Sequence, residues 1–394
     1  MYITPGTGTH NNIKFLYEGE RVVGFECPRP SNMHAHLRKQ ATMRAIAKEL
    51  MHHVYYLLLM PNDGHITSLE ALEERFHEVR AVARECGCAH VRFIMTLFYT
   101  TSITPAVIEA IKRTEERLGI RIEIKWYPPE PGITTGSGYG IRLDANRDEF
   151  RAMEDMGVPL LVHPESAFDI HGKPLDPFDG EAYFFNNVLW PFRDKRSKLR
   201  ISGEHVNTAA GIEWVKADTS GNSFVTITPH GAVCTMHDLE GPQGALFKCK
   251  TRLQTPTDRR AVSEFMVSGD PRAGAGDDTA AHLKRTKLDV PFDKAKDGAF
   301  SGGAQTFVAY AGEFHRQQAL DDRYVQFTAY NGLDWRELAG PNNDDILRFM
   351  LRPQSDRPAS ILVAPENDIV VPIPLGWSGV LTSESRLGLF CEAV

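Results

Sequence analysis

The chain has 394 residues, of which 42% are hydrophobic and 24% charged, and its formal net charge at pH 7 is -7. This composition is typical of globular proteins, and the acidic balance argues against a nucleic-acid-binding surface. The longest apolar run, at 54–60, is too short to cross a bilayer, and we recognise no secretory signal. The six cysteines form no disulfide framework, so we expect free thiols in a cytoplasmic protein.

Short apolar runs alternate along the chain with longer amphipathic segments. The runs expected to be strands are 22–28, 55–60, 91–99, 120–127, 158–163, 199–205, 224–230 and 272–278. Apolar residues recur at i, i+3 and i+4 in the segments expected to be helical, which are 68–86, 105–118, 148–156, 258–269, 302–320 and 345–351. This alternation predicts an α/β protein with a parallel sheet covered on its outer face.

About eight such units favour a closed (β/α)₈ TIM-like barrel. An open doubly wound sheet is the alternative, but no glycine-rich turn follows the first expected strand. We expect a single domain over residues 1–394, with the barrel at about 20–350. The proline-interrupted segment at about 353–394 is expected to be a β-like C-terminal extension.

Polar side chains stand near the ends of the expected strands, where a barrel carries its chemistry. They are His34, His36, Asn62, Lys125, His163, His205, His230, Asp277 and Asp278. A single histidine at a strand end is more often structural than a ligand, but several on one rim would suit Zn²⁺ or a similar divalent ion. Lys125 is either a rim lysine that reaches solvent or a carbamate, formed with CO₂, that bridges two metals. The residues alone leave both interpretations open.

The segments HAHLR, LMPN, IKWYP, LLVHPE, SGEH, TITPH and GDDTAAH occur in this order. Together they resemble the amidohydrolase superfamily and, within it, the shorter, homodimeric class of dihydroorotases. The resemblance implies a cytoplasmic homodimeric hydrolase with two divalent metal ions, expected to be Zn²⁺. It also implies a small anionic cyclic amide as substrate, without nucleic-acid or membrane partners.

Carried over residue by residue, the resemblance implies a role for each matching position. The first metal would be held by His34, His36, carbamylated Lys125 and Asp278, and the second by Lys125, His163 and His205. Asp278 would also be the catalytic acid and base. The substrate-binding residues would be Arg38, Asn62 and His282, which hold a carboxylate, and Thr134 and Thr135 in a loop that closes over the ligand.

The reaction implied is the reversible hydrolysis of dihydroorotate to N-carbamoyl-L-aspartate in de novo pyrimidine biosynthesis. Two departures concern substrate recognition. The segment 244–254 replaces an apolar stretch, and His230 stands one place earlier than its counterpart in the family, so its role stays open. The alternatives are an enzyme for another cyclic amide, hydantoin-like or lactam-like, and a non-catalytic relative that has lost a metal ligand. No ligand position is lost in this sequence.

Overall fold

Parallel strands form a ring in the computed structural model, which describes residues 3–130, 133, 140–241, 243–342, 344–353, 360–373, 375 and 387–393. The strands, in chain order, are β3 (Asn32–His36), β4 (Tyr56–Leu59), β5 (Arg92–Phe98), β6 (Arg121–Trp126), β7 (Leu160–Val162), β8 (Ile201–Gly203), β9 (Ser223–Ile227), β10 (Ala273–Ala275) and β11 (Thr279–Ala280). Each pairs in parallel with its sequence neighbour, up to the pair of β9 and β10.

The eighth place in the ring is shared by two short strands. β10 pairs with β9, whereas β11 pairs in parallel with β3. Between them, the Asp278 backbone N–H donates to the His34 carbonyl at 2.9 Å. The two ends of the sheet therefore meet, and the predicted (β/α)₈ barrel is confirmed.

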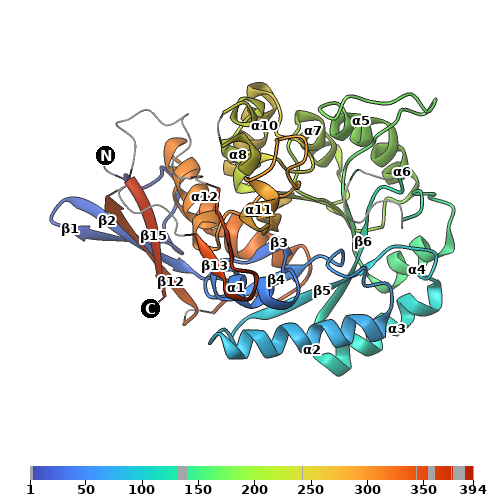
Figure 1. Ribbon diagram of the computed structural model, residues 1–394, viewed down its shortest axis with the longest axis horizontal. Helices are drawn as coiled ribbons and strands as arrows, with labels where there is room; N and C mark the ends of the chain where they lie inside the picture. The colour runs from blue at the N-terminus through green and yellow to red at the C-terminus, as the bar shows by residue number, and fades with distance from the viewer. Residues whose placement is uncertain are drawn as a thin grey trace.

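Helices cover the outside of the barrel (Figure 1). The longer ones are α1 (Gln40–Met51), α2 (Leu69–Glu85), α3 (Pro105–Leu118), α4 (Asp148–Met156), α7 (Ala209–Ala217), α10 (Pro256–Val267) and α12 (Ala304–Arg316). Side chains of Ser68 and Thr104 cap α2 and α3 by accepting from backbone N–H groups. Gly119 ends α3 with φ of 66°, a conformation that glycine adopts without strain.

Shorter helical turns fill the connections. They are α5 (Gly180–Phe184), a π-helix (Phe185–Leu189), α6 (Trp190–Lys195), α8 (Pro229–Val233), a 3₁₀ turn (Met236–Leu239), α9 (Gly244–Phe247), α11 (Lys284–Lys287), α13 (Asp322–Val325), a second π-helix (Gln326–Tyr330), α14 (Asn331–Asp334) and a second 3₁₀ turn (Ala364–Glu366). The helices expected at 68–86, 105–118, 148–156, 258–269 and 302–320 are all present, with small shifts at their ends. Among the described residues, no helix has the length and apolarity needed to cross a membrane.

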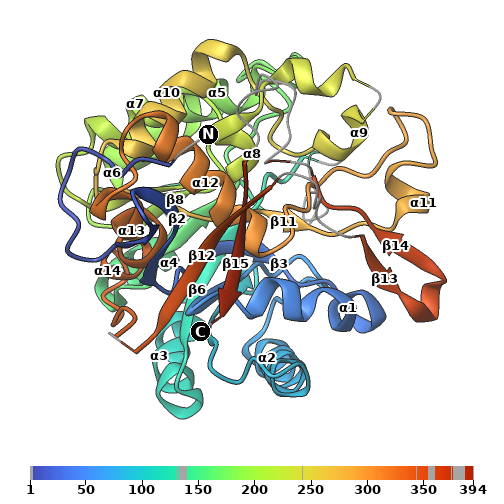
Figure 2. The ribbon, with the colours of Figure 1, turned by 90° about the vertical axis from the view of Figure 1, so that its left-hand side faces the viewer.

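A second, antiparallel sheet is built from both ends of the chain. Its strands are β1 (Lys14–Glu18), β2 (Arg21–Pro28), β12 (Ile346–Pro353) and β15 (Leu387–Ala393), in the order β1-β2-β12-β15. Figure 2 shows β12 and β15 crossing the face of the molecule, with the hairpin of β13 (Ile361–Val363) and β14 (Asp368–Val370) to one side. The predicted β-like C-terminal extension is thus confirmed, and N-terminal strands join it.

Two expected elements were wrong. Segment 22–28 is not the first barrel strand, because β2 pairs with β1 and β12, and β3 takes that place. Segment 345–351 is not helical, because it forms most of β12. Leu347 and Phe349 are buried on either side of the partly exposed Arg348, so the period is two residues and not 3.6. The Phe349 ring stacks on Phe25 with centroids 4.7 Å apart, which secures β12 to β2.

The main hydrophobic core lies between the barrel strands and the helices around them. Strand residues such as Leu57, Ile124 and Ile201 are fully buried there, packed with helix residues such as Leu72 and Ile108. This packing holds the strands rigidly, so the backbone positions of residues at their carboxyl ends are fixed.

Candidate functional site

A cavity of about 260 Å³ opens at the carboxyl ends of the barrel strands. It is lined by eight of the residues singled out from the sequence, namely His34, His36, Arg38, Asn62, His163, His205, Asp278 and His282. Lys125 lies buried in the adjoining barrel interior. Thr134 and Thr135 fall outside the described residues, and His230 does not line the cavity.

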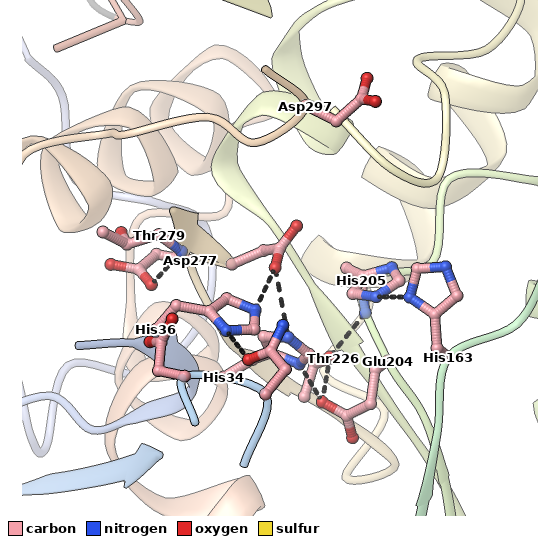
Figure 3. Close-up of polar contacts among 12 residues, drawn as sticks. His34, His36, His163, Glu204, His205, Thr226, Asp277, Thr279 and Asp297 are labelled. Carbon is pink, nitrogen blue, oxygen red and sulfur yellow. Dashed lines mark hydrogen bonds and ion pairs between the residues drawn. The ribbon is translucent and has the colours of Figure 1, made fainter. Parts of the chain in front are cut away.

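Three of these side chains converge closely. The Asp278 Oδ1 lies 3.2 Å from His34 Nε2 and 3.1 Å from His36 Nε2. All three residues are buried, and one possible ligand atom from each lies within 4.8 Å of the others. Figure 3 shows His34 and His36 next to each other, with His205 and His163 beside them. Burial would raise the pKa of Asp278, but hydrogen bonds from His34 and His36 hold it well below its usual value.

His163 and His205 form a second cluster beside the first. His163 Nδ1 lies 2.9 Å from His205 Nε2, and the His34 and His205 ring centroids are 5.0 Å apart. Burial lowers the pKa of both His163 and His205 well below the usual value, because the imidazolium form loses its hydration. Both rings are therefore neutral, which is the form that binds metals.

Backbone strain helps to aim two of these side chains. His205 and Asp278 have φ values of 44° and 46°, a left-handed conformation that non-glycine residues rarely adopt. Each stands just beyond a short barrel strand, β8 for His205 and β10 for Asp278. Such strain persists where the surroundings over-determine it, and it concentrates at functional sites.

Lys125 is the unusual member of the set. Its side chain is fully buried in β6, and Nζ has no hydrogen-bond partner among the described residues. Burial lowers the pKa of Lys125 to about 8. An unpaired ammonium in the barrel interior is unfavourable, and so is the unpaired His205 Nδ1 nearby. These orphaned nitrogens, together with the imidazole and carboxylate donors, fit a site for divalent metal ions.

Further polar residues contact the second ring nitrogen of three of the histidines. Glu204 Oε2 lies 2.5 Å from His34 Nδ1, and Glu165 Oε2 lies 2.9 Å from His163 Nε2. Asn62 Oδ1 lies 2.7 Å from His36 Nδ1, so it fixes that ring as well as lining the cavity. Carboxylates and amides in such positions set the tautomer and orientation of ligand imidazoles.

Sequence reasoning missed Glu204 and Glu165 as parts of the site. Both stand inside motifs that it used, Glu204 directly before His205 and Glu165 two residues after His163. A buried carboxylate beside a predicted ligand histidine was the available signal, because such histidines usually donate their second nitrogen to an acceptor.

Arg38 and His282 are neighbours in the cavity lining. The Arg38 guanidinium donates to Asp63 Oδ1 at 2.9 Å and to the Ala281 carbonyl at 3.0 Å. His282 Nε2 lies 3.1 Å from Arg38 Nη2 and 2.8 Å from the Asp297 carbonyl. Burial and the neighbouring Arg38 lower the pKa of His282 to about 2, so this imidazole is neutral. The fixed guanidinium is the group suited to a carboxylate.

His230 lies apart from these clusters, on the short helix α8. It is buried, burial lowers its pKa to about 4, and Nδ1 has no hydrogen-bond partner among the described residues. The structure therefore brings together the two pairs of histidines, Asp278, Arg38, Asn62 and His282, and leaves His230 outside the cavity.

No protein-family model matches the chain. A dihydroorotase from Rhizobium meliloti is 30% identical over 335 residues, which span 83% of this chain and 90% of that protein. A dihydroorotase from Halorhodospira halophila is 33% identical over 314 residues, spanning 77% of this chain and 84% of that protein. The chain belongs to the dihydroorotase family. The resemblance inferred from the sequence motifs is thereby confirmed.

Solved structures of family members share the fold. A dihydroorotase from Saccharomyces cerevisiae, in complex with 5-fluoroorotic acid, matches with a TM-score of 0.75 and 22% identity, covering 95% of this chain and 100% of that one. A dihydroorotase from Campylobacter jejuni matches with a TM-score of 0.73 and 23% identity, covering 96% and 99%. A D-hydantoinase matches less closely, with a TM-score of 0.62 and 15% identity, covering 89% and 82%. The barrel is therefore the family's fold.

Proposed function

We propose that the protein catalyses the reversible hydrolysis of dihydroorotate to N-carbamoyl-L-aspartate, a step of de novo pyrimidine biosynthesis. Membership of the dihydroorotase family supports this reaction. The observation that carries it is one cavity that joins the buried histidine and Asp278 clusters to the Arg38 guanidinium. Metal-assisted hydrolysis and recognition of an anionic ring need those two parts side by side.

The proposed metal ligands are those that the resemblance to dihydroorotases implies. His34, His36, Lys125 and Asp278 would hold one ion, and Lys125, as a carbamate, would hold a second ion with His163 and His205. The nitrogen and oxygen donors suit Zn²⁺. When bound, a pair of such ions supplies a water nucleophile at neutral pH and polarises the carbonyl that is attacked.

The chain's own residues supply binding and proton transfer. Arg38, with Asn62 and His282 beside it, would hold the ring carboxylate and so orient the scissile amide. Asp278 would take a proton from the attacking water and pass it to the ring nitrogen as the C–N bond breaks. Its Oδ1 lies between two imidazoles, and Asp278 lines the same cavity as Arg38.

The proposed assembly follows the dihydroorotase class that the motifs resemble. We propose a cytoplasmic homodimer, a single domain, and closure of the loop that carries Thr134 and Thr135 over the ligand. Size-exclusion chromatography with light scattering measures the mass of the assembly directly.

The test is turnover of dihydroorotate by metal-loaded protein, followed by ring absorbance, with metal content measured on the same sample. We expect Asp278→Asn to lower kcat by about 10²-fold or more, because it removes the proton carrier. The matched control is Asp277→Asn, which changes a buried carboxylate one residue away that does not line the cavity.

Two results would contradict the proposal. Metal-loaded protein that opened hydantoins but left dihydroorotate intact would favour the alternative cyclic amide, as the altered 244–254 segment allows. Protein that bound no metal under metal-replete conditions would favour a non-catalytic relative.

A further inference from the structure

Lys250 brings an additional cation into the cavity. It follows α9, in the 244–254 segment that departs from the family pattern, and it lines the cavity. Its Nζ lies 3.4 Å from Glu165 Oε1, and the other oxygen of Glu165 accepts from His163 Nε2 at 2.9 Å. Lys250 is therefore anchored beside the His163 and His205 cluster.

Arg38 and Glu165, the carboxylate that anchors this cation, follow strands on opposite sides of the barrel. Arg38 follows β3, and Glu165, the partner of Lys250, follows β7. These strands are four places apart in a ring of eight, so their carboxyl ends face each other across the axis. Figure 3 agrees, because His36 and His163 lie at opposite sides with His34 and His205 between them. The cavity lining thus carries Arg38, which follows β3, and Lys250, which is anchored to a residue after β7.

Ring opening creates a charge that a second cation can bind. Water adds its oxygen to the carbonyl carbon and the C–N bond breaks. One proton of the water goes to the nitrogen, and the other leaves to solvent. The ligand then carries two carboxylates where the ring carried one. With the original carboxylate at Arg38, the new one would form at the carbonyl that is attacked beside the proposed metal ligands. Lys250 lies next to one of these ligands, His163, because both contact Glu165.

Lys250 has donors to spare for that carboxylate. An ammonium has three N–H donors, and among the described residues Glu165 is its one hydrogen-bond partner, at the long distance of 3.4 Å. Its side chain is 16% exposed, whereas that of Glu165 is 4% exposed. We propose that Lys250 is a specificity-determining residue that binds the carboxylate of the ring-opened ligand. This inference rests on the proposed function.

The test compares two open-chain ligands on the holoenzyme. N-carbamoyl-L-aspartate carries the new carboxylate, and N-carbamoyl-L-asparagine carries a neutral amide in its place. We expect Lys250→Met to weaken binding of the aspartate ligand about 10-fold, because a charge-assisted hydrogen bond is lost. The KM for dihydroorotate and the inhibition constant of the asparagine ligand should each stay within about twofold. Inhibition kinetics and calorimetry both measure these ratios.

Two further variants sharpen the comparison. Lys250→Arg keeps the cation and should retain most of the preference for the aspartate ligand. Lys296→Met removes another lysine of the cavity lining, whose charge acts on His282, the neighbour of Arg38. It should leave the ratio of the two open-chain affinities unchanged.

If Lys250→Met weakened the binding of N-carbamoyl-L-aspartate, N-carbamoyl-L-asparagine and dihydroorotate equally, the inference would be overturned. Lys250 would then act only through Glu165 and His163. Unchanged affinities would overturn it as well. If the wild-type protein left dihydroorotate intact, the proposed function would fail on its own. Calorimetry with the two open-chain ligands needs no turnover and would still show whether Lys250 selects the carboxylate.

Discussion

At the scale of single residues, Glu204 determines how His34 is presented. Glu204 is fully buried, and its Oε2 lies 2.5 Å from His34 Nδ1 and 3.1 Å from Thr226 Oγ1. Burial opposes its ionisation, but the contact with His34 lowers the pKa of Glu204 to about 2, so it is a carboxylate. We expect Glu204→Gln to weaken metal retention about 10–100-fold, because the charge that orients the imidazole is lost.

Competition with a graded chelator, followed by metal analysis, measures that retention without reference to turnover. Glu181→Gln is the control, because Glu181 is also buried but bonds to Asn207, Thr208 and Thr251 and, within the described part of the chain, to no histidine. Equal metal loss in both variants would show that any buried carboxylate matters here, and not the contact with His34.

Residue chemistry explains how far the sequence predicts the site. His163 and His205 follow β7 and β8, so strand ends place them on one rim. His34 and His36 end β3 itself, and the motif HAHLR marks them although the expected first strand, 22–28, belongs to the other sheet. Lys250 reaches the same cavity from a connection after α9, and only the folded path of that connection shows which histidine it approaches. Nor does any sequence pattern signal the positive φ of Asp278, which aims its carboxylate.

At the scale of elements, the periodicity of apolar residues predicts the helices that pack against neighbouring parts of the chain. Helices such as α3 and α4 bury one face against the adjoining strands, and their sequence pattern records that face. The strands β2 and β12 pair across most of the chain's length, with Phe25 stacked on Phe349. Such distant pairing has no signal in the local sequence. The expected barrel strand at 22–28 therefore belongs to the second sheet, and the expected helix at 345–351 is a strand.

Asp218 links elements on the outside of the barrel. It accepts from Arg193 of α6 at 3.0 Å, from Ser220, and from the backbone N–H of Ser223 in β9 at 2.8 Å. Burial would raise the pKa of Asp218, but the bonds from Ser220 and Arg193 outweigh it and hold the pKa well below its usual value. Asp218 therefore stabilises the fold at pH values above the unfolded pKa of about 3.9, and this stabilisation is lost as pH falls through the folded value.

We expect Asp218→Asn to lower the free energy of unfolding by about 2 kcal/mol at neutral pH, because hydrogen bonds to a charged group are weakened. The difference in free energy of unfolding between the wild type and the variant should decrease as pH falls below about 4. Thermal melts of both proteins across this range measure it, with Asp155→Asn, at an exposed carboxylate of α4, as control. If this difference in free energy stayed constant as pH fell, the stabilising role of the Asp218 carboxylate would be contradicted.

At the scale of the whole molecule, a buried ion pair ties the late part of the chain into the barrel. Glu123 and Lys125 are two residues apart on β6, so both point to the same face of the strand. Glu123 Oε1 accepts from Arg336 Nε at 2.8 Å, and neither side chain is exposed. Arg336 also donates to the Gly332 carbonyl at 2.9 Å and lies over the Phe224 ring. The segment after α14 thereby closes the end of the barrel away from the cavity.

Breaking this pair on one side should destabilise the whole fold. We expect Arg336→Met to lower the free energy of unfolding by about 3–5 kcal/mol, because it leaves the Glu123 charge buried without its cation. Adding Glu123→Gln should recover much of that loss, since the uncompensated charge is then gone. Urea unfolding of the single and double variants measures both free energies of unfolding. The folded double variant should still bind metal at the other end of the barrel. If the double variant were as unstable as the single one, the Arg336 contribution would lie in packing against Phe224 and not in charge.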